Sequence, residues 1–114
     1  MTLIEDYARD GYAIVRRFFA PAEIARIGAA IDNVHAEAIA HGRSFRHGNL
    51  FYKVADGEVR MAQWPSWRSG VLNDVRTDPR FASLLRDMIG DDIKQIINQI
   101  HWKRPGGKGD FAFH

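Results

Sequence analysis

Residues 93–105 of this chain read IKQIINQIHWKRP, and this stretch decides the fold. Its isoleucines recur in an alternating pattern that places Gln99, His101 and Lys103 on one face and Trp102 on the other. The alternation predicts a half-buried β-strand. Because a sheet buries polar groups only when they are paired or line a cavity, the face with Gln99, His101 and Lys103 is the first candidate for a functional site.

The residues after this strand read PGGKGD at 105–110 and FAFH at 111–114. Proline lacks an amide donor and the three glycines permit backbone angles that other residues avoid, so a loop is expected there. The alternation then resumes, with both phenylalanines on one side and His114 on the other.

The run QIHWKRPGGKGDFAFH resembles a segment of the phytanoyl-CoA dioxygenase family, within the iron(II)- and 2-oxoglutarate-dependent oxygenases, that leads into the family's His-x-Asp iron motif. The residues at matching places are Lys103, Pro105, Gly106, Phe113 and His114, while Arg104 replaces the usual first proline. The run YARDGYAIVRRFFAPAEIARI, at residues 7–27, is similar to the family's opening helix, strand and proline-started helix. The resemblance therefore spans nearly the whole chain.

This resemblance implies a fold and a set of site residues. The fold is α+β and is the amino-terminal part of a double-stranded β-helix, jelly-roll or cupin-like, with flanking helices, and residues 1–114 would be a single incomplete domain. In the family, the histidine at the place of His114 binds the metal, and the lysine at the place of Lys103 contacts 2-oxoglutarate. Gln99 and His101 share the face of Lys103 and could hydrogen-bond cosubstrate or substrate. The plainer alternatives are a solvated Lys103 at a strand end and a structural His101 whose hydrogen bonds are satisfied.

The reaction that the resemblance implies needs more ligands than this chain supplies. Such oxygenases bind Fe(II) through two histidines and a carboxylate, which leaves positions for 2-oxoglutarate and dioxygen. The aspartate expected two places beyond His114, the distal histidine and the 2-oxoglutarate-binding arginine are absent from the printed sequence. We therefore expect the whole protein to hydroxylate a small organic substrate. The 114-residue chain alone is expected to be inactive, to bind iron weakly and to self-associate through open strand edges.

Two tryptophans at Trp64 and Trp67 follow the second strand of a predicted hairpin. Aromatic side chains beside the mouth of a barrel can form a wall for substrate, whereas near a turn they also commonly close the core. A rival hypothesis is a non-catalytic binding module that has lost the iron site and holds a small molecule or protein with these tryptophans, Phe45 and His47. A second rival is a nucleic-acid binder that uses arginine and aromatic stacking.

Composition limits the remaining function classes. A chain of 114 residues with 46% hydrophobic and 26% charged residues has one modest core. The formal charge is only +2 and the charges are scattered, so we expect no nucleic-acid partner. Cysteine is absent, which excludes disulfides and thiol nucleophiles. No apolar run approaches the roughly 18 residues of a membrane span, and the amino terminus does not resemble a signal peptide, so a cytoplasmic protein without membrane contact is expected.

The other elements are predicted from local signals. Helices are expected over Thr2–Arg9, from Pro21 to about Ala40 before Gly42, over Gly70–Arg76, and from Pro79, capped by Asp78, to Gly90. A strand is expected over Tyr12–Phe19, a basic loop over Arg43–Asn49, and a hairpin over Leu50–Gln63 that turns at Asp56-Gly57.

Overall fold

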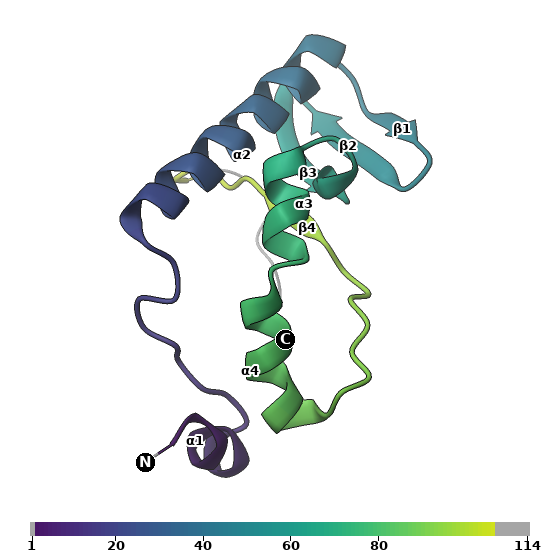
Figure 1. The fold of residues 1–114 in the computed structure, drawn as a ribbon. Coiled ribbons are helices and arrows are strands. Elements are labelled where there is room, and N and C mark those ends of the chain that lie inside the picture. Colours follow the sequence, from purple (N-terminus) through teal and green to yellow (C-terminus); the bar gives the residue numbers. More distant parts are fainter. Residues whose placement is uncertain (1, 107–114) are drawn as a thin grey trace.

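The computed structural model describes residues 2–106, and these form one antiparallel sheet with a long helix packed against it, while the first and last helices lie away from the sheet (Figure 1). The sheet has four strands in the order β1-β2-β3-β4. In chain order the elements are α1 (Leu3–Asp10), α2 (Pro21–His41), β1 (Phe45–His47), β2 (Leu50–Ala55), β3 (Glu58–Gln63), the 3-10 helix η1 (Pro65–Trp67), α3 (Gly70–Arg76), α4 (Pro79–Ile89) and β4 (Gln99–His101). This mixture of helices with an antiparallel sheet confirms the α+β prediction.

The helices begin and end where local signals predict. Thr2 accepts a hydrogen bond from the Glu5 amide and so caps α1. Pro21 is the first residue of α2, and Gly42 ends that helix with a left-handed φ of +69°. Asp78 caps α4 by accepting a hydrogen bond from the Arg80 amide. Within residues 2–106, no helix is both long and apolar enough to cross a bilayer.

The hairpin of β2 and β3 is the best-formed part of the sheet. Asp56 and Gly57 have φ values of +56° and +73°, as a tight two-residue turn requires. The predicted hairpin is therefore confirmed. Lys53 pairs with Met61, but its neighbour Val54 pairs with Val59, so the register shifts by one residue and a β-bulge interrupts β3.

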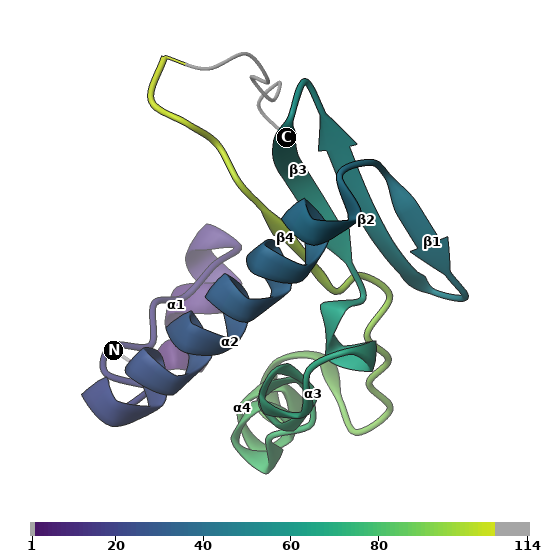
Figure 2. The same ribbon diagram turned by 90° about the horizontal axis from the view of Figure 1, so that it is seen from above.

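The core lies between α2 and the face of the sheet that α2 covers (Figure 2). Tyr52 at its centre is completely buried. Burial raises the pKa of Tyr52 to about 12, and the nearby Glu37 carboxylate contributes to the shift. The buried residues of this cluster are Val34, Ala38, Leu50, Tyr52, Val59 and Ala62. Val34 and Ala38 in the second half of α2 are thus buried, whereas Ile24 in the first half is 53% exposed.

Two predicted strands are wrong in whole or in part. Residues 12–19 form no strand, and Tyr12 and Ile14 are 62% and 61% exposed. Of the strand predicted from Ile93 onward, only Gln99–His101 pairs, and it does so with β3. The reason is the same for both segments. An extended segment becomes a β-strand only when it hydrogen-bonds to another extended segment. Within residues 2–106, no strand pairs with residues 12–19 or 93–98.

The predicted basic loop at Arg43–Asn49 is also wrong, because Phe45–His47 forms β1 and pairs with β2. A two-residue turn at Gly48-Asn49 joins the two strands, and Gly48 has a φ of +61°. The last residues of the predicted loop at 107–110 and the resumed strand at 111–114 lie outside the described residues.

Candidate functional site

The strand β4 presents its polar and apolar side chains on opposite faces, as its sequence predicts. Gln99, His101 and Lys103 are exposed, while Ile100 and Trp102 are half-buried. The backbone amide of Trp102 donates to the Arg60 carbonyl at 3.0 Å, so the pairing with β3 continues past the end of β4. Residues two apart on one face lie roughly 6.5 Å from each other, which suits a row of donors for one small ligand.

The ring of Trp102 shows which side chains of β4 point toward the face of the sheet that α2 covers. It lies 5.3 Å from the ring of His35 on α2, in an edge-on arrangement. Trp102 therefore points toward the helix-covered face. Because neighbouring side chains on a strand alternate, His101 and Lys103 point to the opposite face, which we call the open face. We define the open face by Gln99, His101, Lys103 and the residues that pair beside them on β3, β2 and β1.

Residues of the hairpin complete the open face. Gln63 lies opposite Gln99, and Met61 lies opposite His101. Paired residues share a face, so the next strand adds Lys53 beside Met61 and Phe51 beside Gln63. On β1, the guanidinium carbon of Arg46 lies 4.5 Å from the centre of the Phe51 ring. The open face thus combines cationic and amide donors with an apolar patch, and this combination can bind a carboxylate attached to a short carbon chain.

The predicted metal ligand His114 lies outside the described residues. Among residues 2–106, no group of three or more histidine, cysteine, aspartate and glutamate side chains is close enough to hold a metal ion. His101 on the open face therefore has no such group around it within the described part. These residues do not by themselves fit an iron centre.

Trp64 and Trp67 lie at the end of the sheet where β3 ends. Trp64 is half-buried, whereas Trp67 is 69% exposed and does not close the core. Both line a cavity of about 460 Å³ whose other residues are Asn49, Ser66, Asn73 and Arg76. Phe45 of the binding-module hypothesis is not part of this surface, because its ring stacks on His41 at 4.0 Å and packs against the core.

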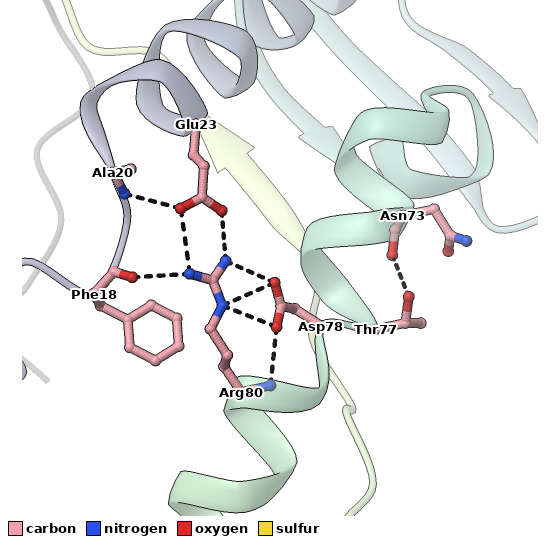
Figure 3. Close-up of polar contacts among 7 residues, drawn as sticks. All are labelled: Phe18, Ala20, Glu23, Asn73, Thr77, Asp78 and Arg80. Carbon is pink, nitrogen blue, oxygen red and sulfur yellow. Dashed lines mark hydrogen bonds and ion pairs between the residues drawn. The ribbon is translucent and has the colours of Figure 1, made fainter.

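Arg80 joins three parts of the chain through a polar network away from the open face (Figure 3). Its Nη2 lies 2.6 Å from a Glu23 carboxylate oxygen and 2.7 Å from one of Asp78, and its Nη1 donates to the Phe18 carbonyl at 3.0 Å. The guanidinium also lies over the rings of Phe18 and Phe19. Hydrogen bonds from Arg80 lower the pKa values of Glu23 and Asp78. This network fixes the start of α2 against the start of α4, so its role is to position helices.

Sequence reasoning missed the hairpin residues of the open face and the cavity residues Asn49, Asn73 and Arg76. Alternation in the hairpin contained a signal for Phe51 and Lys53, because the Asp-Gly turn sets their distance from the tip. For Arg76, the pattern of residues contains no signal beyond a basic residue in the last turn of a helix.

Comparison with known protein families gave a match to the model of the phytanoyl-CoA dioxygenase (PhyH) family, over residues 7–114. No curated protein and no solved structure matched the chain. The matched range includes the whole sheet and the open face.

Proposed function

This chain belongs to the phytanoyl-CoA dioxygenase family, and we propose that the whole protein is an iron(II)- and 2-oxoglutarate-dependent dioxygenase that hydroxylates a small organic substrate. In this proposal residues 1–114 form the amino-terminal part of a double-stranded β-helix domain. The protein acts on a soluble small molecule and is cytoplasmic.

The open face carries the proposal. A helix already covers the opposite face of the sheet, so a second sheet that closes a jelly roll would pack on the open face and make it the interior of the barrel. Gln99, His101 and Lys103 would then point into that interior. This arrangement supports the prediction that these side chains line a cosubstrate or substrate pocket.

Each side chain of the row has a distinct proposed role. The Lys103 ammonium pairs with a carboxylate of 2-oxoglutarate, and the Gln99 amide, four residues earlier on the same face, donates a hydrogen bond to the same cosubstrate. His101 lies between them and contacts the substrate. Trp64 and Trp67 form an aromatic wall for the substrate at the end of the sheet.

The proposed metal ligand of this chain is His114, and the remaining ligands come from outside residues 2–106. When iron(II) and dioxygen are bound, the chemistry they supply is oxidative decarboxylation of 2-oxoglutarate to succinate, coupled to hydroxylation of a substrate C–H bond. The open face contributes binding and orientation, since Lys103 and Gln99 hold the cosubstrate and the apolar side chain of Met61 excludes water beside it.

A test compares two lysines in the whole protein. With Lys103→Met, we expect the KM for 2-oxoglutarate to rise at least about tenfold, because the site loses a charge-assisted contact to a carboxylate. The matched control is Lys94→Met, which removes an exposed lysine that precedes the paired strand and should leave the KM unchanged. Succinate formation in the presence of iron(II) is the measurement.

A wild-type protein loaded with iron(II) that consumes no 2-oxoglutarate with any of a panel of substrates would contradict the proposed function. Ligand binding without 2-oxoglutarate consumption is the outcome that the non-catalytic binding module predicts.

A further inference from the structure

The cavity beside Trp64 contains a guanidinium that a neutral side chain holds in place. Arg76 donates from Nε and Nη2 to the Asn73 side-chain oxygen, at 3.2 Å and 2.9 Å. Within residues 2–106, no carboxylate forms an ion pair with Arg76. The amide of Asn73 therefore fixes the direction of the guanidinium without neutralising its charge.

Two other arginines, Arg68 after η1 and Arg80 on α4, have carboxylate partners. Arg68 lies 2.8 Å from a Glu37 carboxylate oxygen, and Arg80 binds the carboxylates of Glu23 and Asp78. Each of these cations already has an anionic partner inside the protein. Arg76 is oriented in a comparable way but keeps its positive charge available to a ligand.

Trp64, on the aromatic side of the cavity, has an unusual backbone conformation. Trp64 has a φ of +51°, in the left-handed region that residues other than glycine rarely adopt. Its amide donates to the Asn98 carbonyl at 2.6 Å, which ties this residue to the segment before β4. Backbone strain of this kind is concentrated at binding sites, where it fixes the direction of a side chain.

We propose that the cavity lined by Asn49, Trp64, Ser66, Trp67, Asn73 and Arg76, here called the Arg76 subsite, binds the anionic group of a substrate with a flat apolar body. The anion, a carboxylate or a phosphate, pairs with the Arg76 guanidinium. The apolar body packs against the rings of Trp64 and Trp67. As a substrate site, the Arg76 subsite rests on the proposed dioxygenase function, and it narrows the substrate class to anions.

The size and position of the cavity fit this assignment. Its volume of about 460 Å³ lies within the range of small-molecule sites. Trp64 directly follows Gln63, whose partner in the sheet is Gln99 on the open face. The Arg76 subsite therefore lies at the end of the sheet where Gln63 pairs with Gln99.

The experiment titrates the whole protein with 3-phenylpropanoate, with its neutral analogue 3-phenylpropanamide, and with phenyl phosphate. The readout is the proton–nitrogen NMR spectrum of the indole groups of Trp64, Trp67 and Trp102. We expect the carboxylate or the phosphate to shift the signals of Trp64 and Trp67 saturably. Trp102, which packs against His35, is the internal reference and should not shift.

The charge requirement is tested in two ways. The amide should bind at least about tenfold more weakly than the carboxylate, because it lacks the charge that pairs with Arg76. Arg76→Gln should weaken carboxylate binding by a similar factor. The matched control Arg86→Gln changes another exposed arginine in the last turn of a helix and should leave the affinity unchanged.

Equal affinity for the carboxylate and the amide would overturn the proposal, and this comparison needs no variant. Equal affinities of Arg76→Gln and Arg86→Gln, or the absence of Trp64 and Trp67 shifts with both anions, would overturn it as well. The tighter of the two anions identifies the substrate class as carboxylate or phosphate. Probe binding is measured without turnover, so the two proposals can fail separately. If the protein consumes 2-oxoglutarate but does not bind the probes, the dioxygenase function stands and the Arg76 subsite is wrong. If it binds the probes but consumes no 2-oxoglutarate, the anion site stands and the dioxygenase function is wrong.

Discussion

The hairpin of β2 and β3 and the two segments 12–19 and 93–98 have similar compositions but different structures. All three are rich in β-branched or aromatic residues, yet only the hairpin forms a ladder. Tyr52 in the hairpin is completely buried, whereas Tyr12 is 62% and Ile96 is 75% exposed. Strand propensity is thus realised where a partner is close in the sequence and remains unrealised where none is available within residues 2–106.

The difference teaches which interactions hold this part of the protein together. A two-residue turn joins β2 to β3, so the two strands can hydrogen-bond to each other, and α2 covers one face of the hairpin. The segment 12–19 is held mainly at its end, where Arg80 binds the Phe18 carbonyl. Four substitution experiments on the whole protein can break or sharpen this contrast.

The largest effect is expected for Tyr52→Ala. Removing a fully buried aromatic side chain leaves a cavity between α2 and the sheet, and the free energy of unfolding should fall by about 3–5 kcal/mol. Tyr12→Ala, the same change at an exposed site, should alter it by less than about 0.5 kcal/mol. Urea unfolding measures both variants. Similar losses at the two sites would mean that residues 12–19 are buried in the whole protein, so that they would not differ from the hairpin.

The second effect concerns the turn at Asp56-Gly57, which brings β3 beside β2. Gly57 has a φ of +73°, so Gly57→Ala places a side chain in the left-handed region and should cost about 1–2 kcal/mol. Gly28 lies inside α2 with an ordinary φ and open space around it. Gly28→Ala should therefore stabilise the protein by about 0.5–1 kcal/mol. In thermal unfolding, the melting temperature should fall for Gly57→Ala and rise for Gly28→Ala. An unchanged melting temperature for Gly57→Ala would show that the turn conformation does not determine the stability of the hairpin.

These local signals explain why much of the fold is predictable from the sequence. The caps at Thr2 and Asp78 and the turn at Asp56-Gly57 each act within a few residues, so their consequences can be derived without tertiary contacts. The row of Gln99, His101 and Lys103 on one face follows from alternation alone.

Features that depend on contacts distant in sequence could not be predicted. The strand β1 has only three residues, of which Arg46 and His47 are polar, and it forms because the edge of β2 pairs with it. The bulge in β3 places Met61, and not Arg60, opposite Lys53. Arg76 becomes a candidate binding residue only because the packing of α3 against η1 brings it into one cavity with Trp64.

The third effect is the loss of the Arg80 network, which ties segment 12–19 to the helices. Arg80→Gln should destabilise the protein less than Gly57→Ala, because the network is partly exposed and screened by water. Amide hydrogen exchange of Ala20, whose N–H donates to Glu23, should become several-fold faster. Arg86→Gln, which breaks an exposed pair with Asp91, should leave this exchange rate unchanged.

The pH dependence of the same network has a defined sign. Arg80 lowers the pKa values of Glu23 and Asp78 below their ordinary values of 4.5 and 3.8. A depressed carboxyl pKa contributes stability that is fully present above the unfolded value and is lost as the pH falls through the folded value. The difference in stability between wild type and Arg80→Gln should thus be constant near neutral pH and shrink below about pH 4.5. A difference that grows on acidification would contradict this assignment.

The smallest effect is expected in segment 93–98, and it tests whether the missing strand partner lies elsewhere in the whole protein. Ile96 is 75% exposed, so Ile96→Ala should change the free energy of unfolding by less than about 0.5 kcal/mol. Ile100→Ala, at a half-buried site opposite Ala62, should cost about 1–2 kcal/mol. A loss of more than about 2 kcal/mol for Ile96→Ala would mean that another part of the protein covers this segment. The strand predicted from Ile93 onward would then be correct in the whole protein, since its isoleucines would have the partner that residues 2–106 do not supply.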